Sequence, residues 1–137
     1  MIMSHQLCDS AKSTLEEISA IIPGIDNNPA SEEQKAILSR TDGEVVYGTR
    51  LLVRKVSDLM RQMSFPQNST ITVMKSLKPS VILNEEIRKV TRYLIVLSEK
   101  ALLNPGGEIC YGHYIITHEE VEVDPGAIII FITSKQG

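Results

Sequence analysis

The sequence contains an uninterrupted apolar run at residues 127–132, Ala-Ile-Ile-Ile-Phe-Ile, directly after a turn signal at residues 124–126, Asp-Pro-Gly. A strand with one solvent-facing side alternates apolar and polar residues, and this run does not alternate. Both faces of the strand that it predicts must therefore be covered. In a chain of 137 residues this favours a sheet with helices on one face and a different cover on the other, for which a second copy of the chain is one candidate.

The composition is that of one ordinary globular domain. With 42% hydrophobic and 23% charged residues, a chain of 137 residues is long enough to bury an independent core. The formal net charge of −3 gives no reason to expect a nucleic acid or an anionic membrane as the partner. Two Phe, four Tyr and no Trp leave few rings on which single-stranded bases could stack.

Cysteine content and apolar run length indicate the compartment. Two cysteines, Cys8 and Cys110, are too few for a disulfide framework, and reduced thiols are typical of the cytosol. The first residues lack the basic segment and apolar run of a signal peptide. No apolar run approaches the ~20 residues that cross a bilayer. We therefore expect a soluble, cytoplasmic protein that has no membrane contact.

Apolar spacing predicts helices in the first half of the chain. Apolar residues recur at intervals of three and four between Leu7 and Ile22, which predicts a helix over residues 4–22. Capping-box patterns predict a short helix over residues 31–39 and a longer one over residues 41–63. The next segment, residues 70–76, is β-branched and alternating, which predicts a strand.

A further helix is predicted over residues 84–103. Its apolar stripe runs from Ile87 to Ala101, and two glutamates at its start match the helix dipole. The consecutive apolar residues 93–97 leave a strand as the alternative for that part. Residues 81–83 fit either a strand or the entry to this helix.

Strands are predicted over residues 108–117, 121–123 and 127–133. Together the elements predict a single α+β domain over residues 1–137. In this fold, long amphipathic helices pack on a small, mostly antiparallel sheet that ends in a C-terminal β-hairpin.

Cysteine and histidine cluster at Cys110, His113 and His118. Metal ligands must converge on one point, whereas odd spacings on a regular strand place neighbours on opposite faces. A bulge could change this register. We predict no metal site.

Other reactive side chains do not assemble a catalytic site. Cys8 has His5 one helical turn away, but a nucleophile and its base also need an orienting group. Glu119, Glu120 and Glu122 form an acidic patch that is explained by a solvated loop or a guarded sheet edge. We therefore predict no catalytic residue and no cofactor.

One short segment, about a fifth of the chain, contains Asn104, Pro105, Gly106, Gly112, Glu119 and Val123. In these residues it resembles a strand–turn–strand of the dCTP deaminase and dUTPase superfamily. The serine–arginine motif that carries catalysis in that family is absent from this chain, as is the second half of the family's pattern. The resemblance therefore implies no activity here.

Arginine forms the main functional pattern. Arg50, Arg54 and Arg61 fall within about 40° on a helix wheel and make one ridge. Arg88 and Arg92 make a second ridge on the helix predicted over residues 84–103. Guanidinium groups bind phosphates and carboxylates bidentately, so two facing ridges would form an anion pocket. The alternative is a solvated helix face paired with nearby carboxylates.

These observations favour a small, soluble, non-enzymatic homo-oligomer that acts by binding another macromolecule. A dimer is the commonest closed assembly. The alternative is a binder of, or an enzyme acting on, a small nucleotide-like anion held in an arginine-lined pocket. A second alternative is nucleic-acid binding by the same ridge, which a steep salt dependence would reveal.

Overall fold

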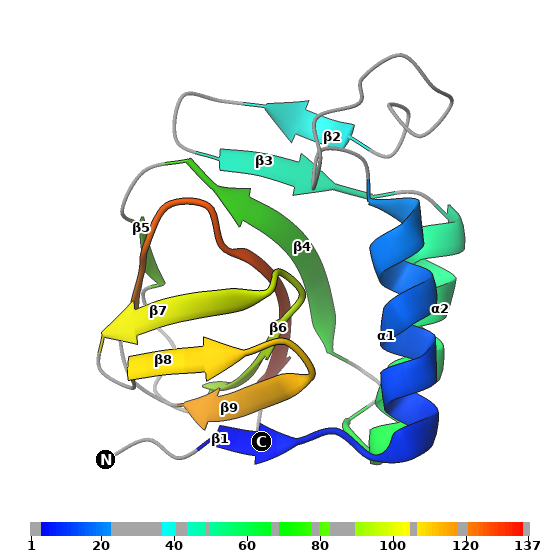
Figure 1. Cartoon of the computed structure of the whole chain (residues 1–137). Helices are drawn as coiled ribbons and strands as arrows, with labels where there is room; N and C mark the ends of the chain where they lie inside the picture. The colour runs from blue at the N-terminus through cyan, green and yellow to red at the C-terminus, as the bar shows by residue number, and fades with distance from the viewer. Residues whose placement is uncertain are drawn as a thin grey trace.

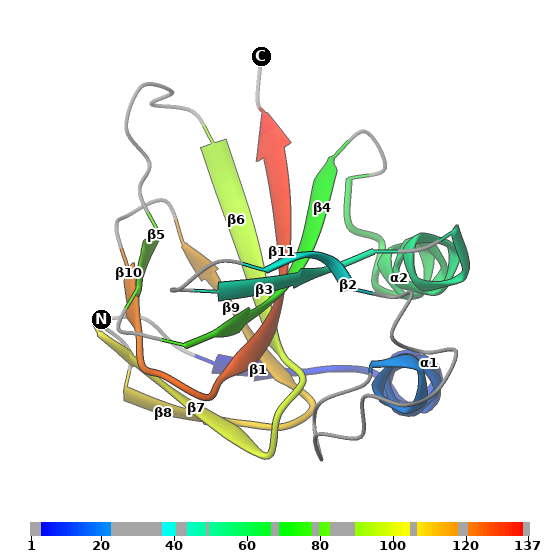
Figure 2. The ribbon, with the colours of Figure 1, turned by 90° about the horizontal axis from the view of Figure 1, so that it is seen from above.

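The computed structural model describes residues 4–22, 37–40, 44–48, 50–66, 69–77, 80–82, 90–104, 107–117 and 121–135. These residues form two antiparallel sheets and two helices (Figures 1 and 2). The helices are α1 (Asp9–Ile21) and α2 (Arg50–Met63). The strands are β1 (Ser4–Gln6), β2 (Ile37–Arg40), β3 (Glu44–Tyr47), β4 (Thr70–Ser76), β5 (Ser80–Ile82), β6 (Val90–Val96), β7 (Lys100–Asn104), β8 (Gly107–Cys110), β9 (His113–Thr117), β10 (Val121–Val123) and β11 (Ile128–Lys135).

The strands β4 to β11 form a jelly roll. The first sheet has the order β1-β9-β6-β11-β4-β3-β2, and the second has the order β5-β10-β7-β8. From β4 to β11 the chain changes sheet at every connection except that from β7 to β8. Two antiparallel sheets of order β4-β11-β6-β9 and β5-β10-β7-β8, connected in this way, have jelly-roll topology. The strands β1, β2 and β3 widen the first sheet at its two edges.

The first sheet lies between the helices and the second sheet. On β11, Ile130 and Ile132 pack with the core residues of α1 and α2, whereas Ile129 and Phe131 pack with residues of the second sheet. All four are buried, so the predicted two-sided burial of residues 127–132 is confirmed. Helices cover one face as predicted, but the chain's own second sheet covers the other. The apolar run therefore gives no reason to invoke a second copy.

The predicted α+β fold of long helices on a small sheet is wrong. Sheet predominates, and the two helices have 13 and 14 residues. The helix predicted over residues 84–103 is wrong wherever the structure describes it, because β6 and β7 occupy that segment. The alternative of a strand at residues 93–97 is confirmed up to Val96. Apolar residues on two consecutive buried strands had reproduced a helical spacing by coincidence.

Other predicted elements are correct in part. The helix predicted over residues 4–22 is confirmed over α1, with the strand β1 at its beginning instead of helix. The helix predicted over residues 41–63 is correct over α2 but wrong at β3. The helix predicted over residues 31–39 is wrong at β2, and residues 31–36 lie outside the described part. The strand at residues 70–76 is confirmed by β4, and β5 shows that residues 81 and 82 are strand.

The predicted C-terminal β-hairpin is also wrong. The turn at residues 124–126 joins β10 to β11, and these strands belong to different sheets. Gly126 has φ +92°, a conformation that side-chain-bearing residues rarely adopt. Its N–H donates to the carbonyl of Ser76 at 2.7 Å, which fixes the turn to the end of β4. The strand predicted over residues 108–117 divides into β8 and β9 at the turn of residues 111–112.

The end of α2 is fixed by hydrogen bonds in the last turn of the helix. The N–H of Ser64 donates to the carbonyl of Arg61 at 3.1 Å, and that of Phe65 donates to Met60 at 2.9 Å. With Ser64 at φ 60°, this is a Schellman motif. The motif directs Phe65 into the core, where its ring stacks on Tyr93 with centroids 4.4 Å apart. Neither described helix has the length and apolar content needed to span a membrane.

Candidate interaction surface

Two arginines of α2, Arg54 and Arg61, point away from the core. At about 100° per residue, Arg54 and Arg61 lie opposite the buried stripe of the helix. Both side chains are exposed, and Arg61 donates to Asp58 one turn earlier. We call Arg54 and Arg61 the arginine ridge; both side chains project into solvent. The buried stripe consists of Leu52, Val56, Leu59 and Met60.

The other predicted arginines do not join this ridge in the described structure. Arg50 begins α2 in line with Arg54, but its side chain lies outside the described part, as does the whole of Arg88. Arg92 lies on β6 instead of a helix. It shares a sheet face with Leu94, which packs against the second sheet. Arg92 and the arginine ridge are therefore on opposite sides of the first sheet and do not converge.

Arg92 belongs to the inside of the jelly roll. Its register partners are Thr133 on β11 and Thr117 on β9. The side chain is half-buried, with Nη1 shielded from solvent. Burial lowers the pKa of Arg92, although a guanidinium stays charged in proteins. Arg92 therefore lies on the face of the first sheet that faces the second sheet, and not on the face that carries α2.

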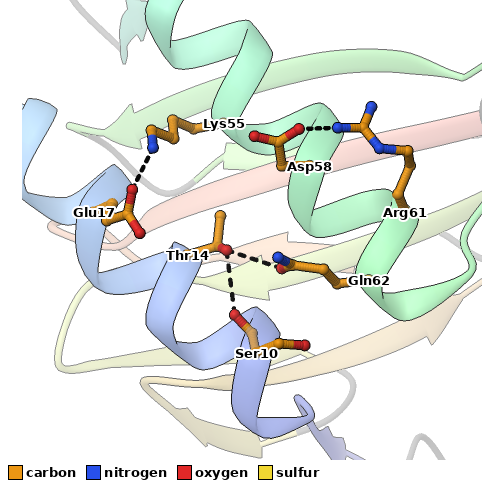
Figure 3. Close-up of polar contacts among 7 residues, drawn as sticks. All are labelled: Ser10, Thr14, Glu17, Lys55, Asp58, Arg61 and Gln62. Carbon is orange, nitrogen blue, oxygen red and sulfur yellow. Dashed lines mark hydrogen bonds and ion pairs between the residues drawn. The ribbon is translucent and has the colours of Figure 1, made fainter.

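Polar contacts join α1 and α2 along one seam (Figure 3). Thr14 Oγ1 donates to Gln62 Oε1 at 2.9 Å, and Lys55 Nζ donates to the carboxylate of Glu17. Later residues of α1 therefore meet earlier residues of α2, so the helices are antiparallel. Their outward faces lie side by side and form one surface, which we call the helix layer.

The two halves of the helix layer carry opposite charge. Asp9 and Glu16 are exposed on the side of α1 that lies opposite the centre of its buried stripe of Ala11, Leu15 and Ile18. With three acidic residues and one basic residue, α1 has a formal charge of −2. With four basic residues and one acidic residue, α2 has a formal charge of +3. Sequence analysis missed the acidic side, although Asp9 and Glu16 have the same seven-residue spacing as Arg54 and Arg61.

Cys8 precedes α1 and is exposed. Its Sγ lies 3.5 Å from Ser10 Oγ. Hydrogen bonding with the Ser10 hydroxyl, followed by the Ala11 backbone N–H at the helix start, lowers the pKa of the thiol. His5 was considered above as a base for Cys8. Its ring lies against that of Tyr114, with centroids 5.3 Å apart. Burial raises the pKa of the Tyr114 hydroxyl, which keeps it protonated at neutral pH.

The alkylation rate of Cys8 should titrate at lower pH than that of an unstructured cysteine peptide, because its thiolate is stabilised. Rates with iodoacetamide in a Cys110→Ser background would measure this. Ser10→Ala should move the profile to higher pH, since the Ser10 hydroxyl is the largest cause of the lowered pKa. Ser13→Ala, on the exposed side of the same helix, is the control. A profile that Ser10→Ala leaves in place would contradict this assignment.

The absence of a metal site stays a prediction. The reason given for it, that Cys110, His113 and His118 lie on one regular strand, does not hold. Cys110 ends β8 and His113 begins β9, so the turn between them removes the single-strand geometry that was assumed. The Nδ1 atom of His113 lies 3.3 Å from the carbonyl oxygen of Tyr111, and His118 lies outside the described part. Among the residues that the structure does describe, no three or more His, Cys, Asp or Glu side chains could hold a metal ion.

No protein-family model matches the chain, and neither the curated proteins nor the solved structures give a significant match. Its function must therefore be inferred from its own surface.

Proposed function

We propose that the protein acts without catalysis, by binding an acidic surface of another macromolecule through the arginine ridge of α2. One observation carries this proposal. In a chain with a net charge of −3, α2 carries four basic residues and one acidic residue, and the exposed Arg54 and Arg61 lie on its outward side. A small anion needs a concave site in which most of its surface is buried, whereas exposed arginines on the outward side of a helix suit a flat or extended partner.

An acidic protein is the favoured partner. The pair of Lys55 and Glu17 is an example, within this chain, of α2 binding the carboxylate of a neighbouring helix. From Arg54 to Arg61 the ridge extends only about 10 Å, at 1.5 Å per residue, so it can contact few phosphates.

Replacing Arg54 and Arg61 by Gln should weaken binding to poly-L-glutamate at low salt by at least about tenfold. Each charge-assisted contact is worth ~1.5–3 kcal/mol, and a tenfold change corresponds to ~1.4 kcal/mol. The melting temperature should barely change, because exposed ion pairs contribute ~0–1 kcal/mol. Titration calorimetry and thermal melting would measure the two effects.

The matched control replaces Lys12 and Lys100 by Gln, which removes the same charge at positions off the ridge. Equal weakening by both double variants would contradict the proposal. Tighter binding to duplex DNA than to poly-L-glutamate, with a steep loss in salt, would instead identify a nucleic acid as the partner. Unchanged binding with a large loss of stability would show that the arginines are structural.

A further inference from the structure

We propose that the acidic partner of the arginine ridge is a second copy of this chain, which docks helix layer against helix layer. This inference rests on the proposed function, because it needs the ridge to bind an acidic protein surface. The helix layer already contains both halves of the required match: the exposed Asp9 and Glu16 on α1, and the exposed Arg54 and Arg61 on α2, where Asp58 is paired with Arg61. A surface that carries both halves side by side can complement itself.

One two-fold arrangement brings the halves together. A two-fold axis that runs between α1 and α2, parallel to both, places α1 of one copy over α2 of its partner. The same rotation places α2 over the partner's α1. The contact therefore occurs twice, as it does in every isologous dimer. Each residue keeps its height along the axis in this rotation.

The seam between the helices fixes the register of this contact. Thr14 meets Gln62 and Glu17 meets Lys55, so the height of Glu16 on α1 falls between those two positions of α2. After the rotation, Glu16 of one copy lies between the partner's Arg54 and Arg61. The partner's Arg54 and the partner's Arg61 are then each about one helical turn from Glu16 along the axis. That separation is within reach of a glutamate and an arginine side chain.

The other face-to-face arrangement is disfavoured by charge. An axis in the interface that runs perpendicular to the helices would place α2 over α2 and α1 over α1. Basic residues would then face basic residues, and acidic residues would face acidic ones. Like charges that face each other across an interface oppose docking, so the parallel axis is selected.

The dimer should be weak and sensitive to salt. Two helices about 20 Å long and about 10 Å wide cover roughly 400 Å² on each copy, half of the ~800 Å² per partner in a standard interface. The stripes that meet are charged and exposed, so screening by salt should dissociate them. We expect a dissociation constant on the order of 0.1–1 mM at low ionic strength.

Two charge-reversed variants test the register. Glu16→Arg alone should remain monomeric, because its arginine would face the partner's ridge. Arg54→Glu with Arg61→Glu should also remain monomeric, because the partner's Glu16 would then meet two added carboxylates beside Asp58. An equimolar mixture of the two proteins should dimerise at least about tenfold more tightly than either alone, because both contacts of the mixed dimer then pair opposite charges. Sedimentation equilibrium at low salt measures all three.

Glu122→Arg is the matched control, since it makes the same charge change on β10 of the second sheet and should dimerise like the parent chain. Thermal melting must show that every variant is folded. A monomeric parent chain near 1 mM, or a mixture no tighter than its components, would overturn the dimer. If poly-L-glutamate binding still depends on the arginine ridge in that case, the proposed function stands and only the partner is wrong.

Discussion

Replacing Ile130 by Asp should prevent the chain from folding. Ile130 is 0% exposed on β11, the central strand of the first sheet, and packs beneath the helices. An unpaired carboxylate buried there costs several kcal/mol, which is comparable with the ~5–15 kcal/mol that holds a domain together. Soluble yield, circular dichroism and binding of a hydrophobic dye would show the loss.

The matched control is Ile116→Asp, the same substitution on β9 at a side chain that is 38% exposed. It should express and melt close to the parent chain. Near-native melting of Ile130→Asp would mean that this side of β11 faces water, which would contradict the position of the helices.

Truncating Leu59 to Ala should cost about 2–5 kcal/mol of unfolding free energy, the range for a buried leucine. Leu59 is 0% exposed on α2 and is part of the contact that holds the helix layer to the first sheet. Val53→Ala on the same helix is the control, since Val53 is 47% exposed and should change stability by only about 0.5 kcal/mol. Urea unfolding measures both, and similar losses would contradict the orientation of α2.

The local spacing of apolar residues predicted those helices and strands in which buried and exposed side chains alternate regularly. The amphipathic α1, most of α2 and the alternating β4 were predicted because one face of each lies on the core and the other does not. The strands β6 and β7 were not predicted. Residues of β6 are buried on both faces, so the alternation of apolar and polar residues that marks a strand is missing there. The turn between these strands depends on Ser98, whose hydroxyl accepts from the N–H of Ile128 at 3.1 Å, a partner 30 positions away.

The candidate surface, like the fold, could be predicted from sequence only where a local pattern encodes it. A helix wheel places Arg54 and Arg61 correctly, because α2 is a real helix and its core stripe fixes the orientation. Arg92 was misplaced by the same error that turned β6 into a helix. The acidic neighbour of the ridge depends on the antiparallel seam between Thr14 and Gln62, a contact across 48 positions that no local spacing encodes.

The pairing of β11 also has a consequence for how the chain reaches this fold. Phe131 is in register with Thr72 on β4 and with Leu94 on β6, 59 and 37 positions earlier. A ribosome therefore releases β4 and β6 well before the strand that bridges them. Because loops of this length must close before the pairing stabilises them, folding should take milliseconds to seconds, as in other high-contact-order β proteins. During synthesis, the edges of β4 and β6 that pair with β11 stay unpaired until β11 is made. The nascent chain is most prone to aggregation in this interval.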